Sequence, residues 1–253
     1  MTRSNLGYLL STLILRDFKV RYRNMSLGIF WSLLNPLVMM AVLSFIFTRI
    51  YASESGRNYH LTVLTGLVAY SFFSLGWSSG TVSILANASL IKRVPVPREI
   101  IPLATVLANG MHFLIQVLLL LVLVLQAGIP ANGMWVWLPV VLVLEAVFIC
   151  GLSLAASALD VYFRDVRYIV ESTNLVMFWL VPIFYSFAVI PEQYHWVYQY
   201  NPVAAVVILL RKILLEATIE LRTIVNLAIL SAGVFAAGLW IFRRMKPRFA
   251  DYL

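Results

Sequence analysis

Few residues in this sequence could carry proton or ion chemistry inside an apolar stretch. Glu145 is the one acid well inside a long apolar run, about ten residues, or roughly 15 Å of helix rise, beyond Trp135. In the preceding run, Asn109, His112 and Gln116 recur at three- and four-residue spacing, so a helix places them on one face. If the two runs fold back on each other, Glu145 comes level with this face, and we expect it to bond to His112 or Gln116.

Three roles are open to this intramembrane polar cluster of Glu145, His112, Gln116 and Asn109. It could be a hydrogen-bonded lock between two helices, an ion or proton relay, or the lining of a polar pathway. We favour the structural lock, because a relay normally needs several ionisable groups near the membrane midplane.

Motifs for nucleotide or metal chemistry are missing from the sequence. None of the four lysines stands in a GxxxxGK phosphate-binding loop, and the three histidines lie far apart without an HExxH motif. The single cysteine, Cys150, allows neither an intrachain disulfide nor a thiolate metal site. We therefore expect no ATPase, no other catalytic site, no metal and no cofactor in this chain.

The composition predicts an all-α membrane protein. Of 253 residues, 62% are hydrophobic and 12% charged, and the mean hydropathy is +0.89. Soluble domains are roughly 45–50% apolar and about 25% charged. We take the net charge of +8 as a signal of membrane orientation first, and expect no nucleic-acid partner.

Charge-free stretches predict six membrane-spanning helices in a single transmembrane domain, because a bilayer core takes roughly 20 apolar residues. The approximate spans are 29–50, 61–85, 103–127, 135–158, 172–190 and 224–242. Pro36 and Pro182 fall within the first and fifth spans, where each can kink or unwind the helix. The apolar run at 203–215 is too short to span, and we expect short re-entrant helices on the external side there.

The basic residues predict the orientation of the chain. Most of the 19 lysines and arginines fall in the segment 1–28, in the connections after the second and fourth spans, and in the tail 244–253. By the positive-inside rule these parts, and both termini, are cytoplasmic. Residues 1–28 should form an amphipathic helix on the inner surface, with Arg16, Lys19 and Arg23 on its cationic face. This helix could anchor the chain to lipid or receive a cytoplasmic partner.

Four separated blocks of sequence resemble those of a known family. They are RDFKVRYRNMSLGIFWSLLNPL (16–37), LIKRVPVPREIIPL (90–103), FRDVRYIVE (163–171) and FYSFAVIPEQYHWVYQYNPVAAVV (184–207). Together they resemble the type-2 ABC permeases that export lipid-linked polysaccharides, such as O-antigen, capsule or teichoic acid.

The resemblance implies partners and roles that the residues alone do not give. It implies a homodimer in the inner membrane of a bacterium, with two copies of a separate cytoplasmic ATPase that binds ATP and Mg. The substrate would be a glycan attached to undecaprenyl pyrophosphate. The implied residues are Arg16, Lys19, Lys92, Arg93 and Arg98 for coupling to the ATPase, Arg21 and Arg23 where substrate enters, and Phe30, Trp31, Trp179, Phe184 and Tyr185 as channel lining.

Three other functions compete with polysaccharide export. A membrane enzyme acting on lipid-linked sugars would need clustered acids or a metal site, and the sequence shows neither. An ion-coupled carrier would normally show internal repeats and several ionisable groups at midplane. An ABC permease for a smaller drug or lipid is the strongest alternative.

Overall fold

The computed structural model describes residues 3–23, 28–50, 58–93, 96–185 and 190–252, and these parts contain helices and no strands. The long helices are α2 (Phe30–Phe45), continued by the π-helical turn η1 (Ile46–Ile50), α3 (Tyr59–Ala86), α5 (Ile100–Gln126), α6 (Leu138–Tyr162) and α10 (Leu221–Met245). The shorter ones are α1 (Arg3–Tyr22), α4 (Ala88–Arg93), η2 (Gly133–Trp137), α7 (Val166–Leu180), η4 (Glu192–Tyr194), α8 (His195–Gln199), α9 (Pro202–Leu215), η5 (Lys246–Arg248) and α11 (Phe249–Tyr252).

Five helical stretches in the described residues are long and apolar enough to cross a membrane. They are Phe30–Ile50, Tyr59–Ala86, Ile100–Gln126, Gly133–Tyr162 and Leu221–Arg248. These correspond to five of the six predicted spans.

The predicted fifth span, 172–190, is wrong as a continuous helix. α7 begins earlier, at Val166, and ends at Leu180. Val181 is extended, with ψ 137°, because the ring of a following proline disfavours helical backbone in the residue before it. Pro182 therefore lies after the helix rather than inside it, whereas Pro36 does lie inside α2. Residues 186–189 of the predicted span lie outside the described residues.

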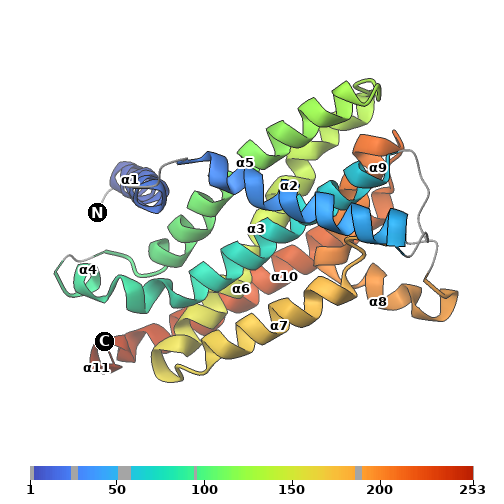
Figure 1. Ribbon diagram of the computed structural model, residues 1–253. Coiled ribbons are helices and arrows are strands. Elements are labelled where there is room, and N and C mark those ends of the chain that lie inside the picture. The colour runs from blue at the N-terminus through green and yellow to red at the C-terminus, as the bar shows by residue number, and fades with distance from the viewer. Residues whose placement is uncertain (1–2, 24–27, 51–57, 94–95, 186–189, 253) are drawn as a thin grey trace.

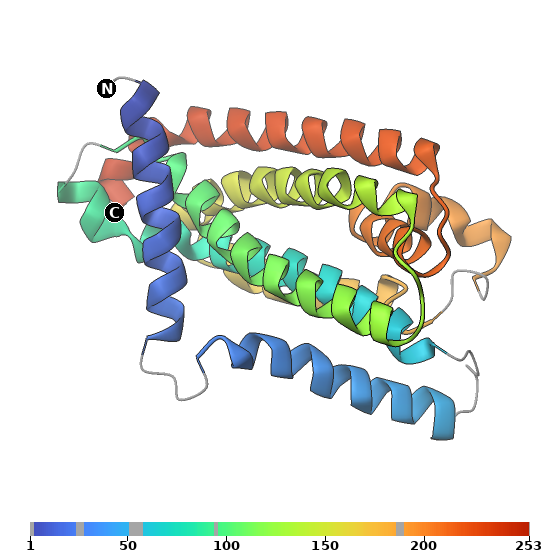
Figure 2. The same ribbon diagram turned by 90° about the horizontal axis from the view of Figure 1, so that it is seen from above.

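The long helices form one bundle, with both termini at the same end (Figure 1). α4 and α11 lie at that end as well, and α8 lies at the opposite end. Figure 2 shows α1 running across the ends of the long helices, with α2 and α10 at opposite edges of the bundle. The helix predicted near the N-terminus is present, and its place on a membrane surface stays a prediction.

Close backbone contacts hold the centre of the bundle together. α3 is buried along most of its length and packs against α5 and α6. α6 and α10 meet at two glycines: a Cβ on Gly238 would lie 2.0 Å from the carbonyl oxygen of Gly151. A Cβ on Gly151 would in turn lie 2.6 Å from the backbone nitrogen of Phe235. Only glycine permits this approach of two helices.

The predicted cytoplasmic tail is packed against the bundle. Phe249 is fully buried beside Phe242 and Tyr162, and the Tyr162 hydroxyl donates a hydrogen bond to the carbonyl of Met245 (2.7 Å). Lys246 Nζ donates to Glu99 Oε1 at 2.7 Å, which ties the tail to the beginning of α5. The chain after α10 is thus a structural element of this end of the bundle.

Candidate functional site

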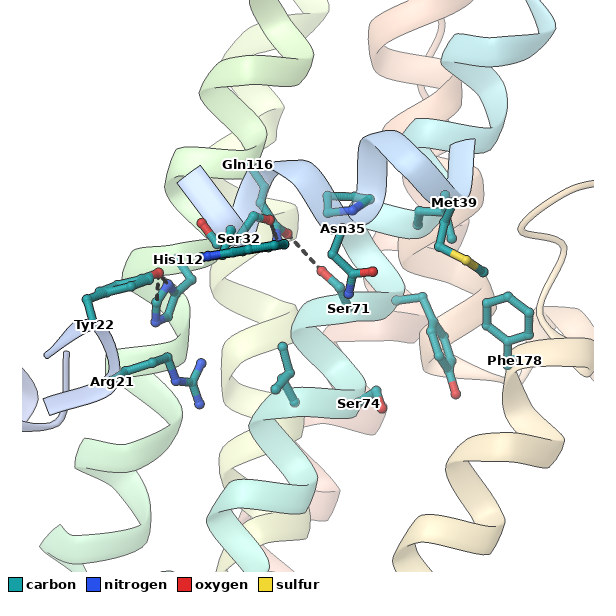
Figure 3. Close-up of a pocket in the computed structure, with 15 residues that line it drawn as sticks. Arg21, Tyr22, Ser32, Asn35, Met39, Ser71, Ser74, His112, Gln116 and Phe178 are labelled. Atoms are coloured by element: carbon teal, nitrogen blue, oxygen red, sulfur yellow. Dashed lines mark hydrogen bonds between the residues drawn. The ribbon is translucent and has the colours of Figure 1, made fainter. Parts of the chain in front are cut away.

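A cleft of about 630 Å³ opens between α2, α3 and α5 (Figure 3). α1 reaches one side of it with Arg21 and Tyr22, and Phe178 of α7 stands on the other side in this view. The remaining lining residues come from α2 (Trp31, Ser32, Asn35, Pro36, Met39), α3 (Leu67, Tyr70, Ser71, Ser74, Leu75) and α5 (His112, Gln116). The mixture of rings, hydroxyls and amides suits a ligand that has both apolar faces and hydroxyl groups.

Gln116 joins three helices across the cleft. Its amide nitrogen donates to the carbonyl of Ser32 in α2 (2.8 Å), and its amide oxygen accepts from the Ser71 hydroxyl of α3 (2.8 Å). About two turns away, Asn109 donates to the Ser79 hydroxyl of α3 (2.7 Å). The polar stripe of α5 therefore faces α3 and α2.

The predicted hydrogen bond between this stripe and Glu145 is wrong. Glu145 is buried in α6, and neither carboxylate oxygen has a hydrogen-bond partner among the described residues. α5 packs more extensively against α3 than against α6, so its polar face turns away from the helix that follows it in the chain. His112 and Gln116 form bonds with α1, α2 and α3 instead.

Polar contacts attach the described side chains of α1 to the bundle. The Tyr22 hydroxyl bonds to the His112 ring of α5, and Asp17 accepts a hydrogen bond from Thr105 of the same helix (3.2 Å). Arg16 bridges Asp17 and Asn87, the residue between α3 and α4. The last turns of α1 are thereby held at the mouth of the cleft.

The structure separates the two arginines predicted to meet the substrate. Arg21 lines the cleft and Arg23 is exposed outside its lining. Burial lowers the pKa of the Arg21 guanidinium, although nearby Tyr22 and Asp17 oppose that effect. An arginine remains cationic in proteins, so Arg21 presents positive charge to the cleft.

The residues predicted to couple to an ATPase differ in their surroundings. Lys19, Lys92 and Arg93 are exposed at the end of the bundle where both termini lie. Arg98 instead donates to the carbonyl of Lys246 (2.7 Å) and lies over the Phe249 ring, 5.8 Å from its centre. Arg98 has a structural role in docking the tail, and Arg16 has one in docking α1.

The five aromatic residues predicted to line a channel also fall into two groups. Phe30, Trp31 and Trp179 are exposed, and Trp31 lines the cleft. Phe184 is buried and stacks on Phe47, with 5.1 Å between ring centres. Tyr185 is half-buried and donates a hydrogen bond to the carbonyl of Leu180 (2.7 Å).

Arg211 is a polar centre that the sequence analysis did not identify as a site residue. It lies on α9, is 7% exposed, and donates to backbone carbonyls of α3 and of the chain after α7. Its signal in the sequence is a cation inside the apolar run at 203–215, for which we predicted only short re-entrant helices.

The charged turn after α6 also has structural partners. Arg167 donates to the buried Asp160 and to the carbonyl of Arg164. These contacts hold the turn between α6 and α7 together.

A family model for the ABC-2 type transporter matches residues 8–215. The match covers most of the chain, and the chain belongs to this family of multi-pass membrane proteins. The family resemblance inferred from the four sequence blocks is confirmed.

Curated relatives match over nearly their whole length. The chain is 33% identical to an O-antigen export system permease protein RfbA of Klebsiella pneumoniae, over 98% of this chain and 97% of that protein. It is 27% identical to an RfbA of Myxococcus xanthus, over 96% and 94% of the two chains. It is 23% identical to the polysialic acid transport protein KpsM of Escherichia coli, over 91% of each chain.

Proposed function

We propose that this chain is the permease subunit of an ATP-driven exporter of O-antigen or a related polysaccharide. The full-length similarity to polysaccharide export permeases carries the proposal. The same similarity disfavours the strongest alternative, in which the substrate is a smaller drug or a lipid. ATP hydrolysis, with its Mg, comes from two copies of a separate cytoplasmic ATPase.

The permease works as a homodimer that crosses the inner membrane six times per subunit. α7 with the segment 181–185 adds one crossing, the fifth along the chain, to the five long apolar helices, and the helices directly after it are the short external ones. The termini, α1 and α4 are cytoplasmic. Only Pro36 and Leu43 of α2 are buried in one subunit, and several α7 side chains are exposed, so both helices have faces left for a second copy and for the channel.

The cleft is the route by which the glycan leaves the inner leaflet. Arg21 attracts the diphosphate of the undecaprenyl carrier as a charge-assisted donor. The amides and hydroxyls of Gln116, Asn35 and Ser71 replace water around the sugar hydroxyls, and Trp31 offers a ring for the apolar sugar face. Many weak contacts of this kind let a polymer slide without being trapped.

The direct test is export in cells that lack this permease but keep its ATPase. Wild-type protein restores surface glycan, and purified protein alone does not hydrolyse ATP. Failure of the wild-type chain to restore any surface polysaccharide, with both subunits present in the membrane, contradicts the proposal.

Arg21 and Arg23 form a matched pair for testing the route. Arg21→Gln lowers export strongly and Arg23→Gln lowers it little, because only Arg21 lines the cleft. Among the rings, Trp31→Ala slows export of long chains more than Trp240→Ala, since exposed Trp240 lies at the far edge of the bundle on α10. Equal effects within each pair, at equal protein levels, mean that the glycan takes another path.

A further inference from the structure

The chain leaves helical geometry between α7 and the short helices that follow it, and does so among apolar side chains. From Val181 to Phe184 every residue is buried, and Val181 is extended. Carbonyls released from a helix need other partners, because an unpaired polar group in an apolar environment costs several kcal/mol. Irregular backbone is stable here only if another group satisfies it.

Arg211 of α9 is that group. Its Nη2 donates to the carbonyl of Ile183 at 2.6 Å, and its Nη1 donates to the carbonyl of Tyr185 at 3.2 Å. Its Nε donates to the carbonyl of Thr62 in α3, also at 3.2 Å. One planar guanidinium thus joins three parts of the chain, and the rigid fork of arginine donors is what allows this.

α3 completes the arrangement around the same segment. The Tyr59 hydroxyl donates to the carbonyl of Phe184. Gly66 admits the chain at close range: a Cβ there would lie 2.9 Å from both the Cα and the carbonyl oxygen of Ile183, and 3.2 Å from Arg211 Nη2. Consecutive carbonyls from Ile183 to Tyr185 are therefore fixed from α9 and α3.

We propose that Arg211 is a positioning residue that holds the segment 181–185 against α3, and that export depends on this position. The inference rests on the proposed function, because the segment carries Phe184 and Tyr185, two of the rings predicted to line the channel. With the carbonyls held, the Phe184 ring stays between Phe47 and Trp179, at 5.1 and 5.4 Å. Without them, the segment and its rings are free to shift.

The adjacent Lys212 is a natural control for Arg211. It follows directly on α9, but its ammonium is partly exposed and pairs with Glu220 at 2.7 Å. Lys212→Met removes one positive charge from the same helix without touching the buried carbonyls. It should leave both the segment and export unchanged.

The first measurement follows the position of the segment without any substrate. Ile183 is fully buried, so Ile183→Cys in a Cys150→Ser background gives a thiol that an impermeant maleimide labels slowly. Arg211→Met raises the labelling rate at least about tenfold, a change corresponding to about 1.4 kcal/mol in the population of the displaced segment. Arg211→Lys gives an intermediate rise, because one ammonium cannot reach three carbonyls in the same geometry.

Gly66→Ala reaches the same segment by a second route. The added methyl displaces Ile183 while Arg211 keeps its charge, so labelling rises in this variant too. If Arg211→Met does not accumulate in the membrane, Arg211→Lys and Gly66→Ala decide the question. Unchanged labelling in both overturns the inference.

The second measurement is export by the same variants with the ATPase present. Arg211→Met and Gly66→Ala lose most export of long chains while ATP hydrolysis by the complex persists. Increased labelling with normal export overturns the link between this segment and export. Failure of the wild-type chain to export would count against the proposed function, and the labelling result would still judge the role of Arg211.

Discussion

The two ends of the bundle differ in how deeply they bury a cation. At the end that holds both termini, Lys92 and Arg93 are exposed, Lys246 pairs with Glu99, and the half-buried Arg98 donates to the carbonyl of Lys246. At the other end, Arg211 is buried and donates hydrogen bonds to three backbone carbonyls. Lys92 and Arg93 are exposed at the surface of the bundle, whereas Arg211 fixes the course of the chain itself. The first end is thus suited to receive a partner, and the second to hold a shape.

The close contact between α6 and α10 connects the two ends of the bundle. Gly238→Ala should have the largest effect on the fold, because the new methyl would lie 2.0 Å from the Gly151 carbonyl oxygen. Overpacking of this kind costs about 1–3 kcal/mol or more. Thermal unfolding of the purified protein measures the loss. Gly233→Ala is the control on the same helix, since nothing lies within 4 Å of its added Cβ, and equal stability of the two variants would contradict the close contact.

Charge reversal should affect the two ends of the bundle differently. Lys92→Glu with Arg93→Glu should uncouple ATP hydrolysis from export, because both side chains are exposed at the proposed ATPase-facing end. The protein should remain inserted, since neither side chain is buried. Arg222→Glu reverses an exposed charge at the beginning of α10, at the opposite end, and should leave coupling intact. If export persists in the double variant, Lys92 and Arg93 do not couple the ATPase to transport, and their charges serve only to orient the chain in the membrane.

Local sequence patterns predicted much of the fold. Charge-free runs located five spans because each is a property of one helix, and the spacing of Asn109, His112 and Gln116 predicted a single polar face. The partner of that face was not predictable in this way. We assumed that neighbours in the chain are neighbours in space, whereas α3 lies against α5 and takes the bonds assigned to Glu145.

Two errors had different causes. The end of α7 carried a local signal, because a proline disfavours helix in the residue before it. We noted Pro182 as a possible break, but the count of charge-free residues continued the span through it. Arg211 carried a weaker signal. Its partners are the carbonyls of Thr62, Ile183 and Tyr185, and every residue has a carbonyl, so no residue type marks the partner.

Replacing Glu145 should change stability less than Gly238→Ala does, and in the opposite direction from the one that a hydrogen-bonded Glu145 predicts. A hydrogen-bonded Glu145 would make Glu145→Leu destabilising. Both carboxylate oxygens lack partners in the described chain, so replacing the side chain with leucine should instead be neutral or raise the free energy of unfolding by up to about 1–3 kcal/mol. Glu145→Gln keeps the polar group and should gain nothing. Loss of export in both variants at normal abundance would point to a proton-linked role.

The smallest effect concerns the tail at the end that holds both termini. Burial tends to raise the pKa of Glu99, but the hydrogen bond and charge of Lys246, together with the charge of Arg243, outweigh burial and lower it below its ordinary value of 4.5. A carboxylate whose pKa is lowered in the folded state contributes its full stabilisation above the ordinary pKa. The contribution disappears as the pH falls through the lower, folded-state value. At neutral pH Glu99 is therefore ionised and its ion pair with Lys246 is intact. A mutation of Glu99 tests the pair without the acid that would protonate other carboxylates.

Glu99→Gln at neutral pH should loosen the tail slightly without unfolding the bundle. Half-exposed ion pairs contribute about 0.2–1 kcal/mol, so amide hydrogens in residues 246–252 should lose protection by less than about fivefold. Glu171→Gln, at an exposed position of α7, should leave this protection unchanged. Arg98 and Phe249 still hold the tail in the Glu99 variant, which is why the effect is small. Complete loss of protection would mean that the ion pair, and not the buried Phe249 ring, docks the tail, and that charge shapes this end of the bundle as firmly as Arg211 shapes the other.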